Sequence, residues 1–198
     1  MSSSDVPRST PATAALDELS RLSLREHSMQ SLLQAVADLS KSVMPGNPET
    51  SITVLDGGRK ITVVTTGQLA QDLDEVQYAQ QHGPCLHAAT SGELTEIHDT
   101  REEHRWPDYV PDAIRLGCLS SLSVPLAIDD RISGALNAYA LEPHAFDDTS
   151  RAIALRFAPY ASVAVANMQA YQDARDMADN LQVALESRAV IDLSLIHI

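Results

Sequence analysis

The sequence predicts an α+β domain in which an antiparallel β-sheet is flanked by helices, with long N- and C-terminal helices forming a bundle. Two pairs of β-branched-rich segments are each joined by a short turn, which predicts β-hairpins and antiparallel neighbours. Helical patterns precede, separate and follow these hairpins, an order typical of α+β folds. Both terminal segments carry apolar residues at heptad spacing, which predicts helices with an apolar seam.

Composition limits the class of protein. The chain has 198 residues, of which 44% are hydrophobic and 21% charged, which excludes wholesale disorder, collagen-like repeats and a membrane bundle. The formal charge of −13 comes without a basic patch, so nucleic acid and anionic membranes are poor direct partners. Two cysteines, Cys85 and Cys118, are too few for a disulfide framework or a Cys-rich zinc site. Residues 1–12 hold no signal-peptide apolar region, so we expect a cytoplasmic protein.

The N-terminal part is predicted to be a disordered tail over residues 1–12 and one helix over residues 13–44. The run from Pro45 to Pro48 ends this helix, because proline lacks the amide that a helix needs. The seam residues repeat every seven positions. They are Leu22, Met29, Val36 and Val43 at one seam position, and Arg25, Leu32 and Leu39 at the other.

The middle of the chain alternates strands with short helices. The hairpins are predicted over residues 51–65, with a turn at 56–59, and over residues 120–141, with a turn at 129–131. A short strand is predicted over residues 94–97. Helices are predicted over 68–81, over 85–91 ending at Gly92, and over 107–116 ending at Gly117. The first of these helices has apolar residues at helical spacing, namely Leu69, Leu73, Val76 and Ala79.

The C-terminal part is predicted to be a long helix that Asp147 or Asp148 caps and that runs to Ala189. Pro159 either kinks this helix or splits it in two. Its later part has a second heptad seam, made of Tyr171, Ala174, Ala178, Leu181 and Leu185. Exposing two apolar seams to water is unfavourable. We therefore expect the terminal helices to pack together and then against the same pair from a second subunit, giving a homodimer.

A set of motifs in this order resembles the GAF domains of actinobacterial GAF–ANTAR regulators over residues 32–192. The motifs are Gln77, Gly83-Pro84-Cys85, Arg105-Trp106-Pro107, the run from Gly134 to Tyr139, and Phe146-Asp147. The resemblance implies a GAF sensory domain over residues 45–166 and a signalling helix over 167–192. It also implies an ANTAR output, a three-helix RNA-binding module that acts in transcription antitermination.

The end of the chain departs from that family. Residues 184–192 look like the opening of an ANTAR domain, but residues 193–198 do not resemble it, and six residues cannot form three helices. We therefore expect the RNA-binding output to be missing from this chain, so that RNA is a partner only of the parent architecture.

The resemblance suggests a sensory pocket beside the sheet for a small molecule whose identity the sequence does not give. The candidate pocket residues are Tyr78, Cys85, Trp106, Leu122 and Asn137. A small molecule or redox event there would shift the helix packing beyond Ala166 and so reach the output. Trp106 either walls the pocket or anchors a helix on the sheet, and Asn137 is either a pocket contact or a residue of the strand ladder.

The redox candidates are Cys85 and Cys118. Cys85 follows Gly83-Pro84 at a helix start, where the helix dipole lowers a thiol pKa, but a buried packing role is the alternative. Some GAF proteins reduce free methionine sulfoxide with cysteines, so a cysteine-dependent reductase is one alternative function. A ligand-free dimerisation module is another. We predict a sensor that is not an enzyme.

No cofactor or metal is predicted. The sequence contains neither a Gly-x-Gly-x-x-Gly run nor a Walker loop. Aromatic residues make up 4% of the chain, which disfavours cyclic nucleotide, haem and bilin ligands. The acidic and histidine residues at 98–104 lack a strong metal-ligand spacing, so we interpret them as a solvated loop before a helix.

Overall fold

The computed structural model describes residues 11–21, 28–129 and 131–195, with side chains of the last helix described as far as Leu181. Five strands form one antiparallel sheet in the order β2-β1-β5-β4-β3. The strands are β1 (Glu49–Asp56), β2 (Arg59–Thr65), β3 (Thr95–Ile97), β4 (Ser120–Ala127) and β5 (Ile132–Ala140). The predicted α+β fold, an antiparallel sheet flanked by helices, is therefore confirmed.

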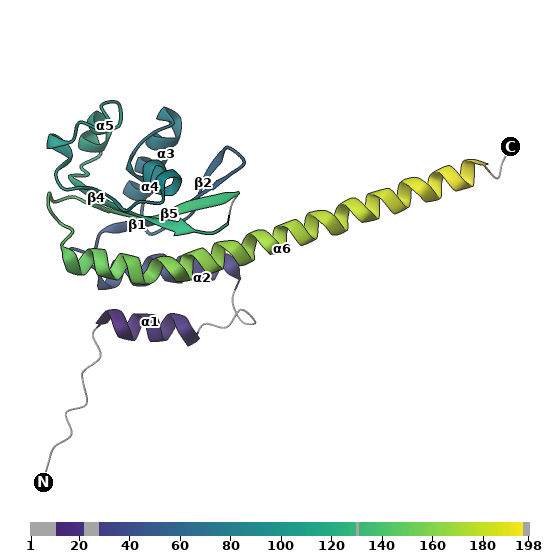
Figure 1. The fold of residues 1–198 in the computed structure, drawn as a ribbon, viewed down its shortest axis with the longest axis horizontal. Coiled ribbons are helices and arrows are strands. Elements are labelled where there is room, and N and C mark those ends of the chain that lie inside the picture. The colour runs from purple at the N-terminus through teal and green to yellow at the C-terminus, as the bar shows by residue number, and fades with distance from the viewer. Residues whose placement is uncertain (1–10, 22–27, 130, 196–198) are drawn as a thin grey trace, which may run out of the picture.

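Helices cover both faces of this sheet in a layered arrangement (Figure 1). On one face lie α3 (Gln68–Gln80), α4 (Pro84–Ser91) and α5 (Tyr109–Arg115), with the short 3-10 helix η1 (Thr100–Glu102) leading into α5. On the other face lie α2 (Met29–Val43) and the first part of α6 (Asp148–Leu195), and α1 (Pro11–Arg21) packs against them from outside. None of the helices in the described ranges is long and apolar enough to cross a bilayer.

Both predicted hairpins form. Gly57 and Gly58 have φ values of 54° and 88°, so the β1–β2 turn has the positive-φ pair that matches the twist of the strands. In the β4–β5 turn, Asp129 Oδ1 accepts hydrogen bonds from the amides of Arg131 (2.7 Å) and Ile132 (2.8 Å). Asp130, also part of the predicted turn, lies outside the described residues.

The prediction of one continuous helix over residues 13–44 is wrong. Ser28 has extended backbone, with ψ of 155°, and its side chain accepts a hydrogen bond from the Ser31 amide at 3.1 Å, so α2 starts afresh with a cap. The separate helix α1 packs back against α2 and buries Ala12 and Ala15. The seam residues Leu22 and Arg25, and residues 1–10 of the predicted tail, lie outside the described residues.

The apolar core lies between the sheet and the α2–α6 layer, so the predicted packing of the two terminal helices on each other is confirmed within the chain. Val36, the central seam residue of α2, is fully buried there beside Leu33. From α6, Phe157 is fully buried in the same core. The N-terminal seam therefore packs within its own chain.

The long helix α6 begins at the predicted place. Asp147 caps it, since its Oδ1 accepts a hydrogen bond from the Ser150 amide at 2.8 Å. Pro159 lies inside the helix without ending it. At 1.5 Å per residue, the 48 residues of α6 span about 70 Å, and its second half projects beyond the domain (Figure 1). Of the last predicted segment, residues 196–198 lie outside the described residues.

The apolar core is expected to depend on Phe157. Replacing it with alanine should lower the free energy of unfolding by about 3–5 kcal/mol, because the lost burial is joined by the cost of a cavity. Ile114→Ala on α5, where the side chain is 40% exposed, is the control and should cost less than about 1 kcal/mol. Urea unfolding measures both. Equal losses for the two variants would contradict this assignment of the core.

Candidate ligand-binding site

The three central strands alternate between polar and apolar side chains, although helices cover both faces of the sheet. In β1, Ser51 and Thr53 alternate with Ile52 and Val54, and all four are buried. An antiparallel sheet with one polar face usually turns that face to water. Here the polar face lies under α3, α4 and α5, so its polar groups need partners inside the protein.

Strand register shows which side chains share each face. Ser51 pairs with Asn137, and Asn137 pairs on its other side with Ser123. We call the surface that these residues form under α3–α5 the polar face. Its strand members are Ser51, Thr53, Ser121, Ser123, Asn137 and Tyr139. The opposite face is apolar and packs on α2 and α6 through Ile52, Val54, Leu122, Val124, Leu136 and Ala138.

A buried carboxyl from α3 lies at the centre of the polar face. Asp74 is fully buried, and its Oδ1 accepts a hydrogen bond from the Tyr139 hydroxyl at 2.6 Å. Its Oδ2 accepts one from Thr62 Oγ1 at 2.8 Å. The Tyr78 hydroxyl lies 2.8 Å from Thr62 Oγ1 and 2.9 Å from Thr53 Oγ1. These contacts tie α3 to three strands through side chains alone.

Burial dominates the electrostatics of this cluster. It raises the pKa of Asp74 from 3.8 to about 6, although the hydrogen bonds from Tyr139 and Thr62 act in the opposite direction. Burial, together with the nearby Asp74 carboxylate, also raises the pKa of the Tyr78 and Tyr139 hydroxyls above their usual range. Asp74 therefore changes charge near neutral pH, while the surrounding hydroxyls stay protonated.

Gln77 joins this cluster to the start of α4. Its Nε2 donates to the Tyr139 hydroxyl at 3.1 Å, and its Oε1 accepts from the Cys85 amide at 2.8 Å. Gly83 makes the contact possible, because a Cβ at this position would lie 2.4 Å from the Gln77 side chain. Its φ of 150° also disfavours any residue with a side chain. Gly83 of the predicted motif thus leaves room for the buried side-chain amide of Gln77.

Part of the hydrogen-bonding capacity of the polar face is unused. Asn137 Nδ2 donates to Ser51 Oγ at 3.2 Å and Thr53 Oγ1 at 3.1 Å, but Asn137 Oδ1 has no partner. Ser121 Oγ, Ser123 Oγ and the Tyr109 hydroxyl are also buried without a partner. Leaving a buried polar group unpaired costs about 1–3 kcal/mol. Their gathering on one face marks it as the candidate ligand-binding site.

The two thiols predicted as redox candidates are both buried. Cys85 is fully buried, and burial raises its pKa well above the usual range, with the Asp74 carboxylate acting in the same direction. Cys118 donates its thiol hydrogen to the Ser120 carbonyl at 3.3 Å, and burial raises its pKa to about 12. The helix start does not lower the pKa of Cys85, so both sulfurs are in the poorly nucleophilic thiol form.

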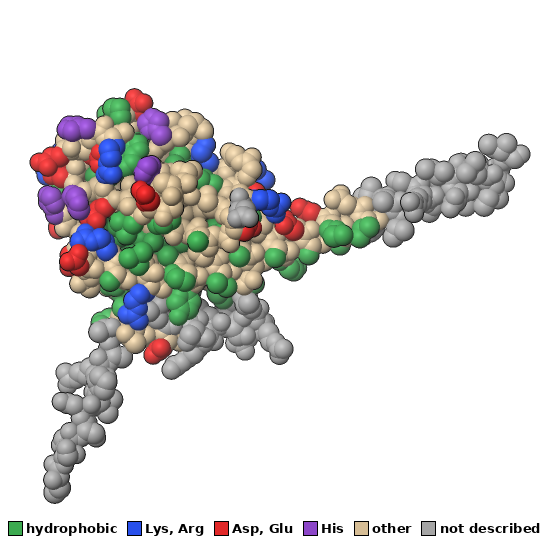
Figure 2. Space-filling model, viewed as in Figure 1, with side chains coloured by type: hydrophobic (Ala, Val, Ile, Leu, Met, Phe, Trp, Pro, Cys, Tyr) green, Lys and Arg blue, Asp and Glu red, His purple; other side chains and the backbone are tan. Residues whose placement is uncertain are grey.

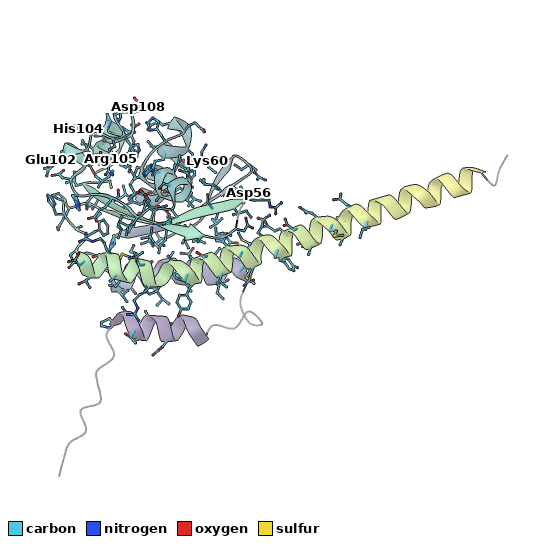
Figure 3. The ribbon with its side chains drawn as sticks, viewed as in Figure 1. Asp56, Lys60, Glu102, His104, Arg105 and Asp108 are labelled. Carbon is cyan, nitrogen blue, oxygen red and sulfur yellow. The ribbon has the colours of Figure 1, made fainter. Side chains whose placement is uncertain are left out.

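Trp106 takes the anchoring role that the sequence offered as one of two alternatives. It is 7% exposed and packs in an apolar cluster with Tyr109 and Tyr139, which anchors the start of α5. It also lines a surface hollow of about 200 Å³ together with Lys60 and His87. The Arg105 guanidinium lies 4.3 Å from the centre of its ring. Figure 3 shows Arg105 at the α5 end of the domain and Lys60 near the β1–β2 hairpin.

The structure brings together only some of the predicted pocket residues. Tyr78, Cys85 and Asn137 lie on or beside the polar face, and Trp106 lies at its border. Leu122 faces α2 and α6 on the opposite side of the sheet, so its prediction as a pocket residue is wrong.

Several residues of the site were missing from the prediction. The strand pattern Ser121-Leu122-Ser123-Val124 signals two faces of different polarity, and this signal identifies the two serines. Asp74 and Gln77 follow Leu73 at one and four positions on α3, where they share its buried side. Polar residues at such positions are read as solvent-facing until the helix is placed on the sheet.

The acidic and histidine residues at 98–104 behave as a paired surface segment. Asp99 accepts hydrogen bonds from Arg101, and Glu103 accepts them from Arg105. Across the part of the chain that the structure describes, no group of three or more His, Cys, Asp or Glu side chains is placed to hold a metal ion.

Comparison with known families supports the fold and the sensory class. A profile of the GAF domain family matches residues 26–166. Among curated proteins, no sequence match to the chain is found.

Solved structures of the same fold serve different roles. The GAF domain of an Acinetobacter phosphoenolpyruvate-protein phosphotransferase has a TM-score of 0.61 at 14% identity, over 82% of this chain and 95% of that one. A free methionine-R-sulfoxide reductase from Neisseria meningitidis, in complex with its substrate, has a TM-score of 0.55 at 19% identity, over 81% and 87%. The GAF3 domain of a Synechocystis protein in its photoproduct state has a TM-score of 0.57 at 15% identity, over 74% and 98%. At such identities the likeness establishes the fold alone.

Removing the buried carboxyl is expected to change the pH dependence of stability. The pKa of Asp74 is raised on folding, so its stabilising contribution is complete below pH 4 and is lost as pH rises through about 6. Relative to Asp74→Asn, the natural chain should lose roughly 2–3 kcal/mol of unfolding free energy between pH 4 and pH 8. Urea unfolding across this range measures the difference, with Asp72→Asn on the same helix as control. A constant difference between the natural chain and Asp74→Asn would contradict the burial of this carboxyl.

Proposed function

The chain belongs to the GAF domain family, and we propose that it is the sensory module of a GAF–ANTAR-type transcription antitermination regulator. The observation that carries this proposal is the buried polar face with its four unpartnered atoms. A small molecule bound there would supply the missing hydrogen bonds. The proposal has three parts, namely a ligand on the polar face, a relay through α6 and an RNA-binding output.

The strands connect the polar face directly to α6. On β5, Asn137 faces the ligand side, while its neighbours Leu136 and Ala138 pack in the core that α2 and α6 share. A displacement of β5 on ligand binding therefore moves the packing surface of Phe157 as well. Two arrangements of α6 on the sheet would then be populated differently with and without ligand.

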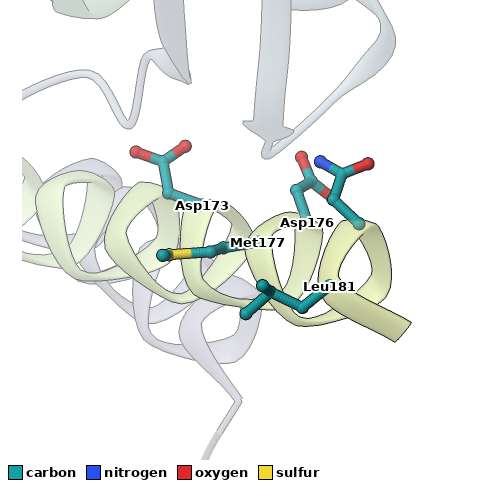
Figure 4. Close-up of a pocket in the computed structure, with 5 residues that line it drawn as sticks. Asp173, Asp176, Met177 and Leu181 are labelled. Carbon is teal, nitrogen blue, oxygen red and sulfur yellow. The ribbon is translucent and has the colours of Figure 1, made fainter. Parts of the chain in front are cut away.

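The projecting half of α6 supports a dimer. All the side chains from Ala170 to Leu181 are exposed, including Tyr171 at 63%, Met177 at 66% and Leu181 at 55%. At 100° per residue, Val163, Met177 and Leu181 fall within about 40° of one another around the helix. Figure 2 shows apolar side chains continuing from the domain onto this projection, and Figure 4 shows Met177 and Leu181 beside Asp173 and Asp176.

An isolated helix that exposes such a stripe is poorly stabilised in water, because most helix stability in proteins comes from packing an apolar face. A second copy offers the same stripe along the same length, so a symmetric pair of α6 helices buries both at once. The second copy would also transmit a shift of α6 to both chains.

The output rests on the resemblance of residues 184–192 to the opening of an ANTAR domain. These residues continue α6 without a break. A change in α6 at the domain therefore reaches them through a single helix. In this architecture RNA is bound by the output, because the chain described here is acidic, with a formal charge of −13 over its 198 residues.

A role without catalysis agrees with the chemistry of the polar face. A cysteine-dependent reductase needs a thiolate that reaches its substrate. Cys85 and Cys118 are both buried, and the pKa of each is raised. The fold shared with a methionine sulfoxide reductase does not carry over that activity. The reductase remains the alternative hypothesis.

The dimer predicts a sharp effect of charge on the apolar stripe. Met177→Glu removes apolar burial worth about 1.5–3 kcal/mol from each copy, so the dimer dissociation constant should rise roughly a hundredfold or more. Gln172→Glu places the same charge on the opposite side of α6 and should leave the constant nearly unchanged. Sedimentation equilibrium measures all three chains. A natural chain that is monomeric at tens of micromolar would rule out this interface.

The sensor proposal predicts no turnover of free methionine sulfoxide. With dithiothreitol as electron donor, methionine formation measured by chromatography should equal that of the Cys85→Ser, Cys118→Ser double variant. An active methionine sulfoxide reductase run in parallel shows that the assay works. Turnover by the natural chain above the double variant would favour the reductase hypothesis instead.

A further inference from the structure

The unpartnered atoms of the polar face form one strip. Ser121 lies opposite Tyr139 in the β4–β5 register, and Ser123 lies opposite Asn137. Ser121 Oγ, Ser123 Oγ, Asn137 Oδ1 and the Tyr109 hydroxyl are all on residues no more than 1% exposed. The strip therefore offers several hydroxyls and one free carbonyl oxygen to a molecule that can donate hydrogen bonds.

The buried charge near this strip is negative, without a buried positive charge among the described residues. Among the buried residues that the structure describes there is no Lys, Arg or His. Asp74 contributes a carboxyl, and its titratable neighbours are Tyr78, Cys85, Tyr109 and Tyr139. Burial raises the pKa of each of these four neighbours above its usual range, so they are neutral between pH 5 and pH 8. Asp74 alone among them becomes charged in that range, with no cation beside it.

These buried groups determine which ligand charge the polar face favours. A phosphate or carboxylate would bring a second negative charge next to Asp74 in a region of low dielectric, with no buried cation to balance either charge. An ammonium group would pair with the Asp74 carboxylate and also supply hydrogen-bond donors. A neutral alcohol would meet the hydroxyls but would leave the Asp74 charge unbalanced.

Tyr139 contacts both this carboxyl and a hollow at the end of the sheet. The Tyr139 hydroxyl bonds to Asp74, and the same residue lines a hollow of about 520 Å³. The hollow is also lined by apolar residues, among them Leu69, Leu116 and Leu141, and by the charged residues Lys41, Glu49 and Glu142. A ligand with a short apolar body and one amino group matches this combination of walls and carboxyl.

We propose that the ligand of the polar face is a small primary amine whose ammonium group pairs with Asp74 and whose apolar body extends past Tyr139 into the hollow at the end of the sheet. This inference rests on the proposed sensory function of that face. It adds the chemical class of the ligand, which neither the family nor the fold specifies.

Three probes with a three-carbon skeleton test the class: propylamine, 1-propanol and propionate. Each is titrated to 100 mM into the ¹⁵N-labelled full chain at pH 8, and amide shifts are followed at Asp74, Asn137 and Tyr139. Propylamine is expected to give saturable shifts at these positions, and propionate none. At pH 5, where Asp74 is mostly protonated, propylamine should bind about tenfold more weakly. Asp74→Asn should weaken it at least tenfold at pH 8, while Asp112→Asn on the surface of α5 should leave it unchanged.

The outcomes separate this inference from the proposed function. Propionate binding as tightly as propylamine would overturn the amine class but would keep a ligand site on the polar face. Equal binding of propanol and propylamine at both pH values would overturn the pairing with Asp74. If none of the three probes gives saturable shifts on this face, both the amine class and the site itself are rejected.

Discussion

The structure depends on a sheet that is buried on both faces while only one face is apolar. The apolar face packs on α2 and α6 in the ordinary way, through side chains such as Leu122 and Leu136. The other face brings hydroxyls and an amide under α3, α4 and α5, and α3 adds the buried carboxyl of Asp74. Contacts among Asp74, Thr62 and Tyr139 pair some of these groups. The remaining unpaired groups are the reason to regard this face as a candidate site.

The same alternation that creates the polar face also links it to the long helix α6. Side chains on successive residues of a strand reach opposite faces, so Asn137 and Ala138 belong to the site and to the helix core respectively. A ligand that reorganises the polar face moves the strands on which α6 packs. Ala138 and Phe157 lie in the same buried core, and close-packed protein interiors transmit small displacements.

Much of the fold could be predicted from local patterns, since turns and caps are set by nearby residues. Gly57-Gly58, Gly92 and Gly117 each take the positive φ that their positions require. The break before α2 was missed, because the heptad pattern runs across Ser28 and its capping contact with Ser31 is local and weak in sequence. Leu122 was assigned to the wrong face because strand periodicity separates two faces without saying which one α3 covers. Asp74 was missed because a carboxyl on a helix is read as exposed until that helix is placed.

The two predicted apolar seams lie in different environments. Val36 lies where α2 crosses the sheet, so its own chain buries it completely. Leu181 lies on the later part of α6, where no other element that the structure describes covers it, and it is 55% exposed. The seam of α2 therefore contributes to the stability of the domain, whereas that of α6 is available to a second chain. Because one continuous helix carries both the core contacts of Phe157 and the exposed stripe, any change in the packing of the first part changes the geometry that the second part presents.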